Sequence, residues 1–205
     1  MDFFPEPPAP PEEDLDEERE DHIEPEWLAA PVDVLPGVVP LEVVIGRSDS
    51  TVVTLTGVRA FATGLAMYLN VLVRGRLGAD RDLNAEVFDG PYPYRDRRAG
   101  GLKWGFELAD GRRATNVDAR DDLFPDSSID GWTPSHPVLN GRGGSGSHRS
   151  VQREQWLWPL PPPGRLRIVC QWDDQDIEVT VTDLEAGPFI EAAARAVPLW
   201  PSAPA

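Results

Sequence analysis

The chain has 205 residues and carries 35 acidic against 19 basic side chains, for a net charge of −16. This length suits one domain with appendages, and residues 1–26, with 12 acids and one arginine, hold −11 of the charge. Such an acidic chain is repelled by phosphate backbones, so we expect no nucleic-acid partner.

The first segment, residues 1–36, combines Pro, Glu and Asp with few aliphatic residues. This composition buries too little apolar surface to offset the entropy of ordering, so it predicts a disordered acidic arm. Phe3, Phe4, Trp27 and Leu28 are apolar anchors within the arm. The arm is either a solubilising tail or a segment that docks on a partner or on its own domain.

Strand patterns begin after the arm. Residues 41–45 and 51–61 are rich in β-branched residues and are bounded by turn formers. In 65–74 the odd-numbered positions 65 to 73 are all apolar, which places them on a core face. Thr63 and Gly64 form the predicted turn between the second and third strands.

Further strands are predicted at 102–108, 112–117, 153–159, 166–172 and 177–182. Asp110 and Gly111 supply a hairpin turn. Residues 118–150 lack sustained periodicity and are predicted to form one long loop. The run Pro159–Pro163 is expected to be a rigid corner between strands. A short helix is predicted at 187–197, with Pro188 in its first turn and Pro198 ending it.

Several short strands with no interleaved helices predict an all-β fold, an antiparallel two-sheet β-sandwich with immunoglobulin-like topology. The expected organisation is a disordered acidic arm at 1–36, followed by a sandwich domain at 37–201. No disulfide can join the sheets, so aromatic rings must supply much of the cohesion between them. The rings expected in that role are Trp104, Phe106, Trp156, Trp158 and Trp172.

Three motifs, taken in their order along the chain, resemble those of a known group of proteins. They are Thr56-Gly-Val-Arg-Ala-Phe61, the stretch Gln155-Trp-Leu-Trp-Pro-Leu-Pro-Pro-Pro-Gly164 after a Gly/Ser run, and Glu191-Ala-Ala-Ala-Arg-Ala-Val-Pro-Leu-Trp200. With them the chain resembles an uncharacterised family of β-sandwich proteins from high-GC bacteria, over about residues 36–201. The resemblance supports the domain boundaries and transfers no catalytic residue.

The cellular compartment is predicted from three features. No apolar run approaches the roughly 20 residues that span a bilayer, and the first residues lack the basic and apolar regions of a secretory signal. Cys170 is the single cysteine, which excludes an internal disulfide and a multi-thiolate metal site. We therefore expect a cytoplasmic protein with no membrane contact.

Candidate chemistry gathers in the long loop. Asp118, Asp121 and Asp122 offer closely spaced carboxylates, which could coordinate Ca²⁺, although they lack the EF-hand register. His136 could join Asp121 and Asp122 in a hydrolytic variant of that site. The Gly141–Ser147 run is not followed by the Lys of a phosphate-binding loop, and its Ser lacks the nucleophile-elbow pattern.

The sequence therefore favours a non-enzymatic binding or protein-interaction module with no cofactor. Binding residues concentrate on loops held by a rigid scaffold, and the candidates are Tyr92, Tyr94, Trp132 and Arg142. One alternative is a calcium-dependent binding or hydrolytic domain that uses the acidic loop 118–136. A second alternative is an inhibitor or immunity-type protein whose acidic arm binds a basic partner.

Overall fold

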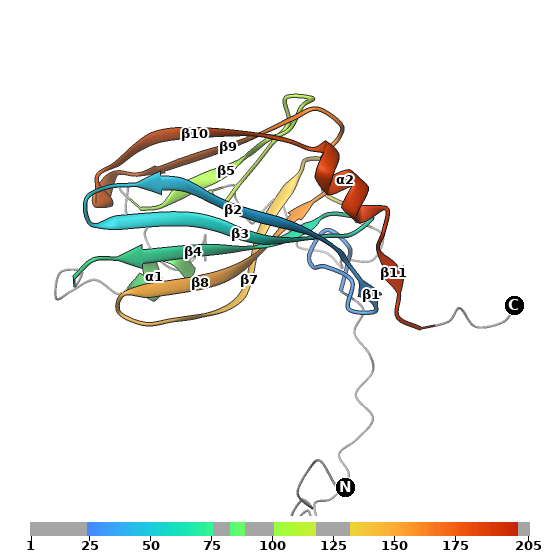
Figure 1. Ribbon diagram of the computed structural model, residues 1–205, viewed down its shortest axis with the longest axis horizontal. Helices are drawn as coiled ribbons and strands as arrows, with labels where there is room; N and C mark the ends of the chain where they lie inside the picture. The colour runs from blue at the N-terminus through green and yellow to red at the C-terminus, as the bar shows by residue number, and fades with distance from the viewer. Residues whose placement is uncertain (1–23, 76–82, 89–100, 118–131, 201–205) are drawn as a thin grey trace, which may run out of the picture.

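Two antiparallel sheets face each other across an apolar core in the computed structural model (Figure 1). The structure describes residues 24–75, 83–88, 101–117 and 132–200. The all-β sandwich predicted from the sequence is confirmed. Its strand order does not by itself establish the immunoglobulin-like connectivity that we expected.

The larger sheet has five strands in the order β2-β3-β4-β8-β7. Their bounds are β2 Gly37–Arg47, β3 Thr51–Ala60, β4 Leu65–Val73, β8 Ser150–Trp158 and β7 Val138–Gly146. All five odd-numbered positions from 65 to 73 in β4 are buried, which confirms the predicted core face. The predicted turn is confirmed too, because Phe61 and Gly64 exchange backbone hydrogen bonds.

The smaller sheet has four strands in the order β10-β9-β5-β6. Their bounds are β10 Ile177–Glu185, β9 Arg165–Trp172, β5 Lys103–Glu107 and β6 Arg113–Thr115. Asp173–Gln175 forms a 3₁₀ turn between β9 and β10. The proline-rich corner predicted at 159–163 joins β8 to β9 and so carries the chain from the larger sheet to the smaller one.

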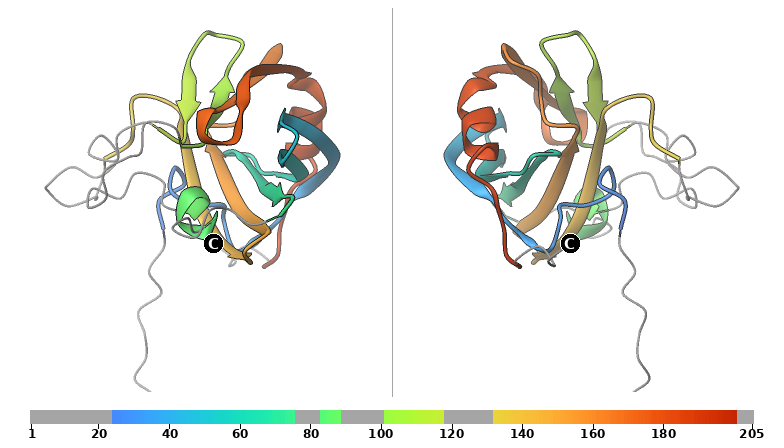
Figure 2. Two further views of the ribbon diagram at one scale, coloured as in Figure 1. Left: turned by 90° about the vertical axis from the view of Figure 1, so that its left-hand side faces the viewer. Right: turned by 90° about the vertical axis from the view of Figure 1, so that its right-hand side faces the viewer.

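The two sheets approach each other at both edges, as the end-on views show (Figure 2). At one edge β2 lies beside β10, where the Thr180 hydroxyl donates a hydrogen bond to the Ile45 carbonyl oxygen. At the other edge β6 lies beside β7. The sandwich is therefore close to a flattened barrel, an arrangement that leaves few exposed strand edges.

Four short elements flank this sandwich. Helix α2, Gly187–Ala193, packs on β2 and β3. Helix α1, Leu83–Phe88, packs on β7 and β8 and was not predicted. The strands β1, Val34–Leu35, and β11, Val197–Pro198, pair with each other.

Two predicted boundaries are wrong. The helix predicted at 187–197 ends at Ala193, and Val197 is in a strand because the residue before a proline disfavours helical geometry. The loop predicted at 118–150 contains strand β7 from Val138 to Gly146. Glycines hid this strand from the sequence pattern, yet a Cβ at Gly141 would lie 2.4 Å from the Arg153 Cζ, so a side chain there would displace the Arg153 guanidinium.

The aromatic core differs in part from the prediction. Trp104, Phe106 and Trp172 lie between the sheets, and the Trp104 and Phe106 rings meet edge to face at 5.6 Å. Trp156 and Trp158 belong instead to clusters on the opposite face of β8. Expecting these two rings between the sheets was therefore wrong, and their position directs attention to the outer face of the larger sheet.

Candidate interaction surface

Residues 24–30, which we call the strap, lie on the outer face of the five-stranded sheet, the face turned away from the smaller sheet. Trp27 is the anchor of the strap and is only 1% exposed. Its ring meets Trp132 edge to face, with centroids 5.2 Å apart, and packs in one cluster with Val138 and Trp158. A tryptophan buried this far fixes the strap on the sheet.

A second aromatic cluster continues the same surface towards β1. Phe61, Ala66 and Trp156 form its buried part, and Ala30 and Val34 pack against them. The Phe61 and Trp156 ring centroids are 5.8 Å apart in an edge-to-face arrangement. The covered region therefore extends beyond the strap to the strand that follows it.

Three polar contacts fix the position of the strap along the sheet. The Trp156 indole donates a hydrogen bond to the Glu26 carbonyl oxygen at 3.0 Å, and the Asn140 amide donates one to the Leu28 carbonyl oxygen at 2.8 Å. The Arg142 guanidinium pairs with the Glu24 carboxylate at 2.7 Å. Two backbone oxygens and one carboxylate are thus bound by side chains of β7 and β8.

We name the residues that hold the strap the strap site. They are Trp132, Val138, Asn140, Arg142, Trp156 and Trp158. Gly64 supports the site from the turn before β4, because a Cβ there would lie 2.7 Å from the Trp156 ring. The strap site is consequently built from two adjacent strands, a flanking loop residue and a turn that accommodates the large ring.

The contacts of the strap correct the predicted domain boundary. We placed the end of a disordered arm at residue 36, whereas residues 24–36 include the buried Trp27 and strand β1. Of the two alternatives for Trp27 and Leu28, docking on the chain's own domain is the one observed. The part of the predicted arm at 1–23 lies outside the described residues.

Two of the four predicted binding residues, Trp132 and Arg142, meet in the strap site. The other two, Tyr92 and Tyr94, lie outside the described residues. Sequence reasoning missed Asn140, which it had left in a long loop. The sequence contained one signal for the strap site, namely the spacing of Trp156 and Trp158. Residues two apart on a strand lie on the same face of the sheet.

The predicted calcium ligands Asp118, Asp121 and Asp122 also lie outside the described residues. Within the described part of the chain, no group of three or more His, Cys, Asp or Glu side chains is arranged to hold a metal ion. His136 is half-buried in the segment before β7. The calcium-dependent alternative therefore stays a prediction.

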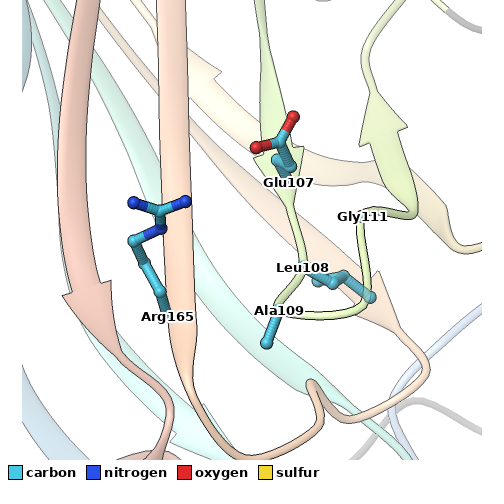
Figure 3. Close-up of a pocket in the computed structure, with 5 residues that line it drawn as sticks. All are labelled: Glu107, Leu108, Ala109, Gly111 and Arg165. Atoms are coloured by element: carbon cyan, nitrogen blue, oxygen red, sulfur yellow. The ribbon is translucent and has the colours of Figure 1, made fainter.

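A hollow of about 400 Å³ lies beside the β5–β6 turn and is shown in Figure 3. Glu107 of β5 and Arg165 of β9 line it together with Leu108, Ala109 and Gly111. The Glu107 carboxylate is occupied by ion pairs with Arg113 at 2.7 Å and Arg167 at 3.3 Å. The charged groups at this hollow thus form a surface ion-pair network.

The inward side of β8 carries polar groups that serve the fold. Arg153 is 9% exposed, and its guanidinium donates to the carbonyl oxygens of Val87, Gly141 and Arg142 at 3.0 to 3.3 Å. These bonds join α1 to β7. A buried guanidinium that binds several carbonyl oxygens has a structural role, because those oxygens need donors once water is excluded.

The remaining outer face of the five-stranded sheet combines a polar row with exposed apolar side chains, among them Val44 and Leu72, which are 42% and 51% exposed. The Gln152 amide donates to the Asn70 side-chain oxygen at 2.9 Å, and the Asn70 amide donates to the hydroxyls of Thr54 and Thr56 at 3.3 and 3.0 Å. We call this region the open half, in contrast to the covered half under the strap. It is bounded by the Arg59–Glu154 ion pair at 2.7 Å.

Comparison of the chain with protein-family models, with curated proteins and with solved structures gave no match. Within the described residues, no helix has the length and apolar character needed to cross a membrane.

Proposed function

We propose that this chain is a non-enzymatic protein-interaction module that binds a linear segment of a partner protein at the strap site. The observation that carries the proposal is the mode in which the strap is held. One tryptophan is buried in an aromatic cluster, two carbonyl oxygens accept side-chain hydrogen bonds, and one carboxylate pairs with an arginine.

These contacts match what interfaces use for short peptides. A buried aromatic anchor supplies most of the affinity, and polar contacts to the backbone fix the register. The strap site presents Trp132 and Arg142, which are the residue types enriched at such contacts. A partner segment of the same chemistry, an acidic residue followed by tryptophan, would compete with the strap for the site.

The non-enzymatic part of the proposal is supported by the roles of the buried polar groups. Thr51 and Gln175 bind each other at 2.7 Å in the core, and Arg153 is occupied by backbone carbonyl oxygens. Burial raises the pKa of the Cys170 thiol to about 12, which keeps this sulfur protonated and poorly nucleophilic. We include a cytoplasmic location in the proposal, because a buried free thiol suits a reducing compartment.

The test uses the full chain with Trp27→Ala, which removes the anchor of the strap. A labelled peptide of residues 22–31 should bind this variant and should bind the unsubstituted chain at least about tenfold more weakly, because the strap in place competes. A matched peptide with alanine at position 27 should bind neither chain. Fluorescence anisotropy reports both affinities, and circular dichroism confirms that the variant is folded.

Two results would contradict the proposal. The first is equal binding of the peptide by the Trp27→Ala chain and by the same chain with Asn140→Ala and Arg142→Gln added. The second is failure of the peptide to bind a folded Trp27→Ala chain. If that variant does not fold, Trp27→Phe with Glu24→Gln in the otherwise unchanged sequence weakens the strap and leaves every residue of the strap site in place. Peptide with tryptophan should then bind more tightly than peptide with alanine.

A second candidate function is the inhibitor or immunity-type role of the acidic arm. It is favoured by the anchoring of Glu24 and Trp27, which fixes the root of a segment whose first 23 residues contain ten acids and one arginine. A basic partner captured through this segment would be released by moderate salt, whereas a partner bound at the tryptophan anchor would be retained.

A further inference from the structure

Strands β1 and β11 form a two-stranded ribbon that belongs to neither sheet of the sandwich and lies beside α2 (Figure 1). Leu35 pairs with Val197, and two residues further along the ribbon the Leu199 amide donates a hydrogen bond to the Asp33 carbonyl oxygen at 2.7 Å. Residues opposite each other in such a pair point to the same face, and successive residues of a strand point to opposite faces. The register therefore assigns each side chain of the ribbon to one of its two faces.

One face of the ribbon packs on the sandwich and the other does not. Val34 lies in the aromatic cluster of Trp156, so its face is the inner one. Leu35, Val197 and Leu199 share the opposite, outer face, and each of them is just over half exposed. A strand pair of this length has little stability in water on its own, and an apolar outer face adds to it only when something covers that face.

Two further apolar side chains extend this exposed surface. Val32 precedes Asp33 and is almost fully exposed, and Trp200 follows Leu199 and is about three-quarters exposed. We name the whole set the ribbon patch, which consists of Val32, Leu35, Val197, Leu199 and Trp200. These five are half of the ten large apolar side chains that are exposed in the described part of the chain. Exposed apolar side chains that gather in this way mark a site of association.

The ribbon patch is almost free of charge. Asp33 is the only charged side chain in residues 31–41 and 196–200. Glu191 in the last turn of α2 and Arg195 between α2 and β11 carry opposite charges. Because charged groups lose free energy when they are buried without a counter-charge, this surface favours a partner surface that is itself apolar and nearly uncharged.

The exposed area of the ribbon patch agrees with what a weak dimer needs. Taking about 100 Å² for a fully exposed Val or Leu side chain and about 200 Å² for Trp, the patch exposes roughly 400 Å² of apolar surface. Since apolar atoms make up about 60% of an interface, this corresponds to about 650 Å² per copy. Specific complexes bury about 600 to 1,000 Å² per partner, so the patch falls at the lower end of that range.

We propose that the ribbon patch is the interface of a homodimer, in which the outer faces of two ribbons pack on each other about a twofold axis. Such an axis brings a surface against its own copy, and a second ribbon patch supplies the apolar, nearly uncharged counterpart that this surface requires. An axis that passes at Leu35 and runs perpendicular to the strands keeps the two Asp33 carboxylates at opposite ends of the interface. The inference goes beyond the proposed peptide binding, because the ribbon patch and the strap site share no residue.

The first measurement is the molar mass of the full chain by sedimentation equilibrium, compared with the 22.6 kDa of one copy. A small interface implies a dissociation constant on the order of 50 µM, so we expect monomer at about 2 µM and mostly dimer at about 500 µM. Raising the salt from about 0.05 to about 0.5 M should strengthen the dimer several-fold. The reason is that the net charge of −16 on each copy opposes association, and salt screens this repulsion.

The decisive variant is Leu199→Ser together with Trp200→Ser. It should raise the dissociation constant at least about tenfold, because these two side chains supply much of the apolar area. The matched control is Val179→Ser with Val181→Ser, which removes two comparably exposed apolar side chains from β10 and should change the constant by less than about twofold. Circular dichroism confirms that both variants are folded.

A cysteine close to the twofold axis gives a second measurement. Val197→Cys should form a disulfide-linked dimer in oxidised glutathione, because the dimer holds the two copies of this position close together. Val181→Cys on β10 is the control, since Val181 and Val197 are exposed to nearly the same extent, and it should link at least about tenfold more slowly. Cys170 does not take part, because burial raises the pKa of its thiol to about 12.

The inference is overturned by a chain that stays monomeric at about 500 µM and about 0.5 M salt. It is also overturned by a dimer that Leu199→Ser with Trp200→Ser leaves unchanged, or by equal linking rates at positions 197 and 181. A monomeric chain that binds phosphatidylcholine vesicles, and loses this binding with Trp200→Ser, would assign the patch to a lipid surface instead. Each of these results leaves the peptide-binding proposal standing, because the strap site is unchanged in all of the variants.

Discussion

The covered and open halves of the outer sheet face are built on the same strands, β4 and β8. Their side chains differ in whether another segment buries them or whether they bind one another. In the covered half, Trp156 and Trp158 are shielded by the strap and by the residues that follow it. In the open half, Gln152 and Asn70 form a hydrogen-bonded row that faces solvent. The change from rings to amides occurs within six residues of β8, from Gln152 to Trp158.

This difference shows that the side chains on a sheet face depend on whether another segment covers that face. Large apolar rings on an outward face require a cover, because leaving them exposed forfeits a few kcal/mol of burial each. Polar side chains that bind one another require none. The same reasoning explains why the tryptophan anchor of the strap lies in the covered half, where the neighbouring rings bury it.

The largest expected effect is loss of the anchor of the covered half. Trp27→Ala should lower the free energy of unfolding by about 3 to 5 kcal/mol, as for other buried aromatic residues. Trp200→Ala is the matched control, because Trp200 is 74% exposed, and it should change the stability by less than about 0.5 kcal/mol. Urea unfolding followed by circular dichroism measures both, and equal effects would mean that the strap adds nothing to stability.

The next largest effect on stability is expected for a substitution in the turn beside Trp156. Gly64→Ala places a methyl group 2.4 Å from the Leu157 carbonyl oxygen and 2.7 Å from the Trp156 ring. Forcing these atoms apart should destabilise the protein by about 1 to 3 kcal/mol. Gly143→Ala in β7 meets no atom within 4 Å and should change the stability by less than about 1 kcal/mol. A harmless Gly64→Ala would show that the turn and ring can separate.

The sequence predicted the fold better than it predicted the covered half. Alternation in β4 is clean, so its core face could be assigned from the pattern alone. In β8, Arg153 and Gln155 point inward while Trp156 points outward, which is the reverse of what polarity suggests. The reversal depends on contacts with Val87 and Glu26, far away in the chain, and no local pattern contains that information.

The candidate site, like the covered half, was predicted only in part. Trp132 and Arg142 were recognisable as candidate binding residues by their type and their position near glycines and prolines, and the structure places both against the strap. Their occupant was not recognisable, because the strap is more than 100 residues earlier in the sequence. The strand Val138–Gly146 was missed because its glycines weaken the strand signal, although they make room for the Arg153 guanidinium.

A smaller effect is expected for the hydrogen bond that fixes the register of the strap. Asn140 is buried, and Asn140→Ala leaves the Leu28 carbonyl oxygen without this donor, which should cost about 1 to 2 kcal/mol. Gln152→Ala removes a single bond from the open half, where water replaces the amide, so its effect should stay within about 0.5 kcal/mol. Thermal unfolding of the two variants compares the halves directly, and a reversed order would contradict the distinction.

The smallest effect is expected for the Arg142–Glu24 pair, whose side chains are both about one-third exposed. A double-mutant cycle with Arg142→Gln and Glu24→Gln should give a coupling free energy of about 0.2 to 1 kcal/mol, since water and ions screen such pairs. The coupling should fall towards zero at about 0.5 M salt. If it persisted there, the pair would be held in a drier environment than its exposure indicates. The pair would then keep Glu24 on β7 at high salt, although it would still contribute less to stability than the buried ring of Trp27.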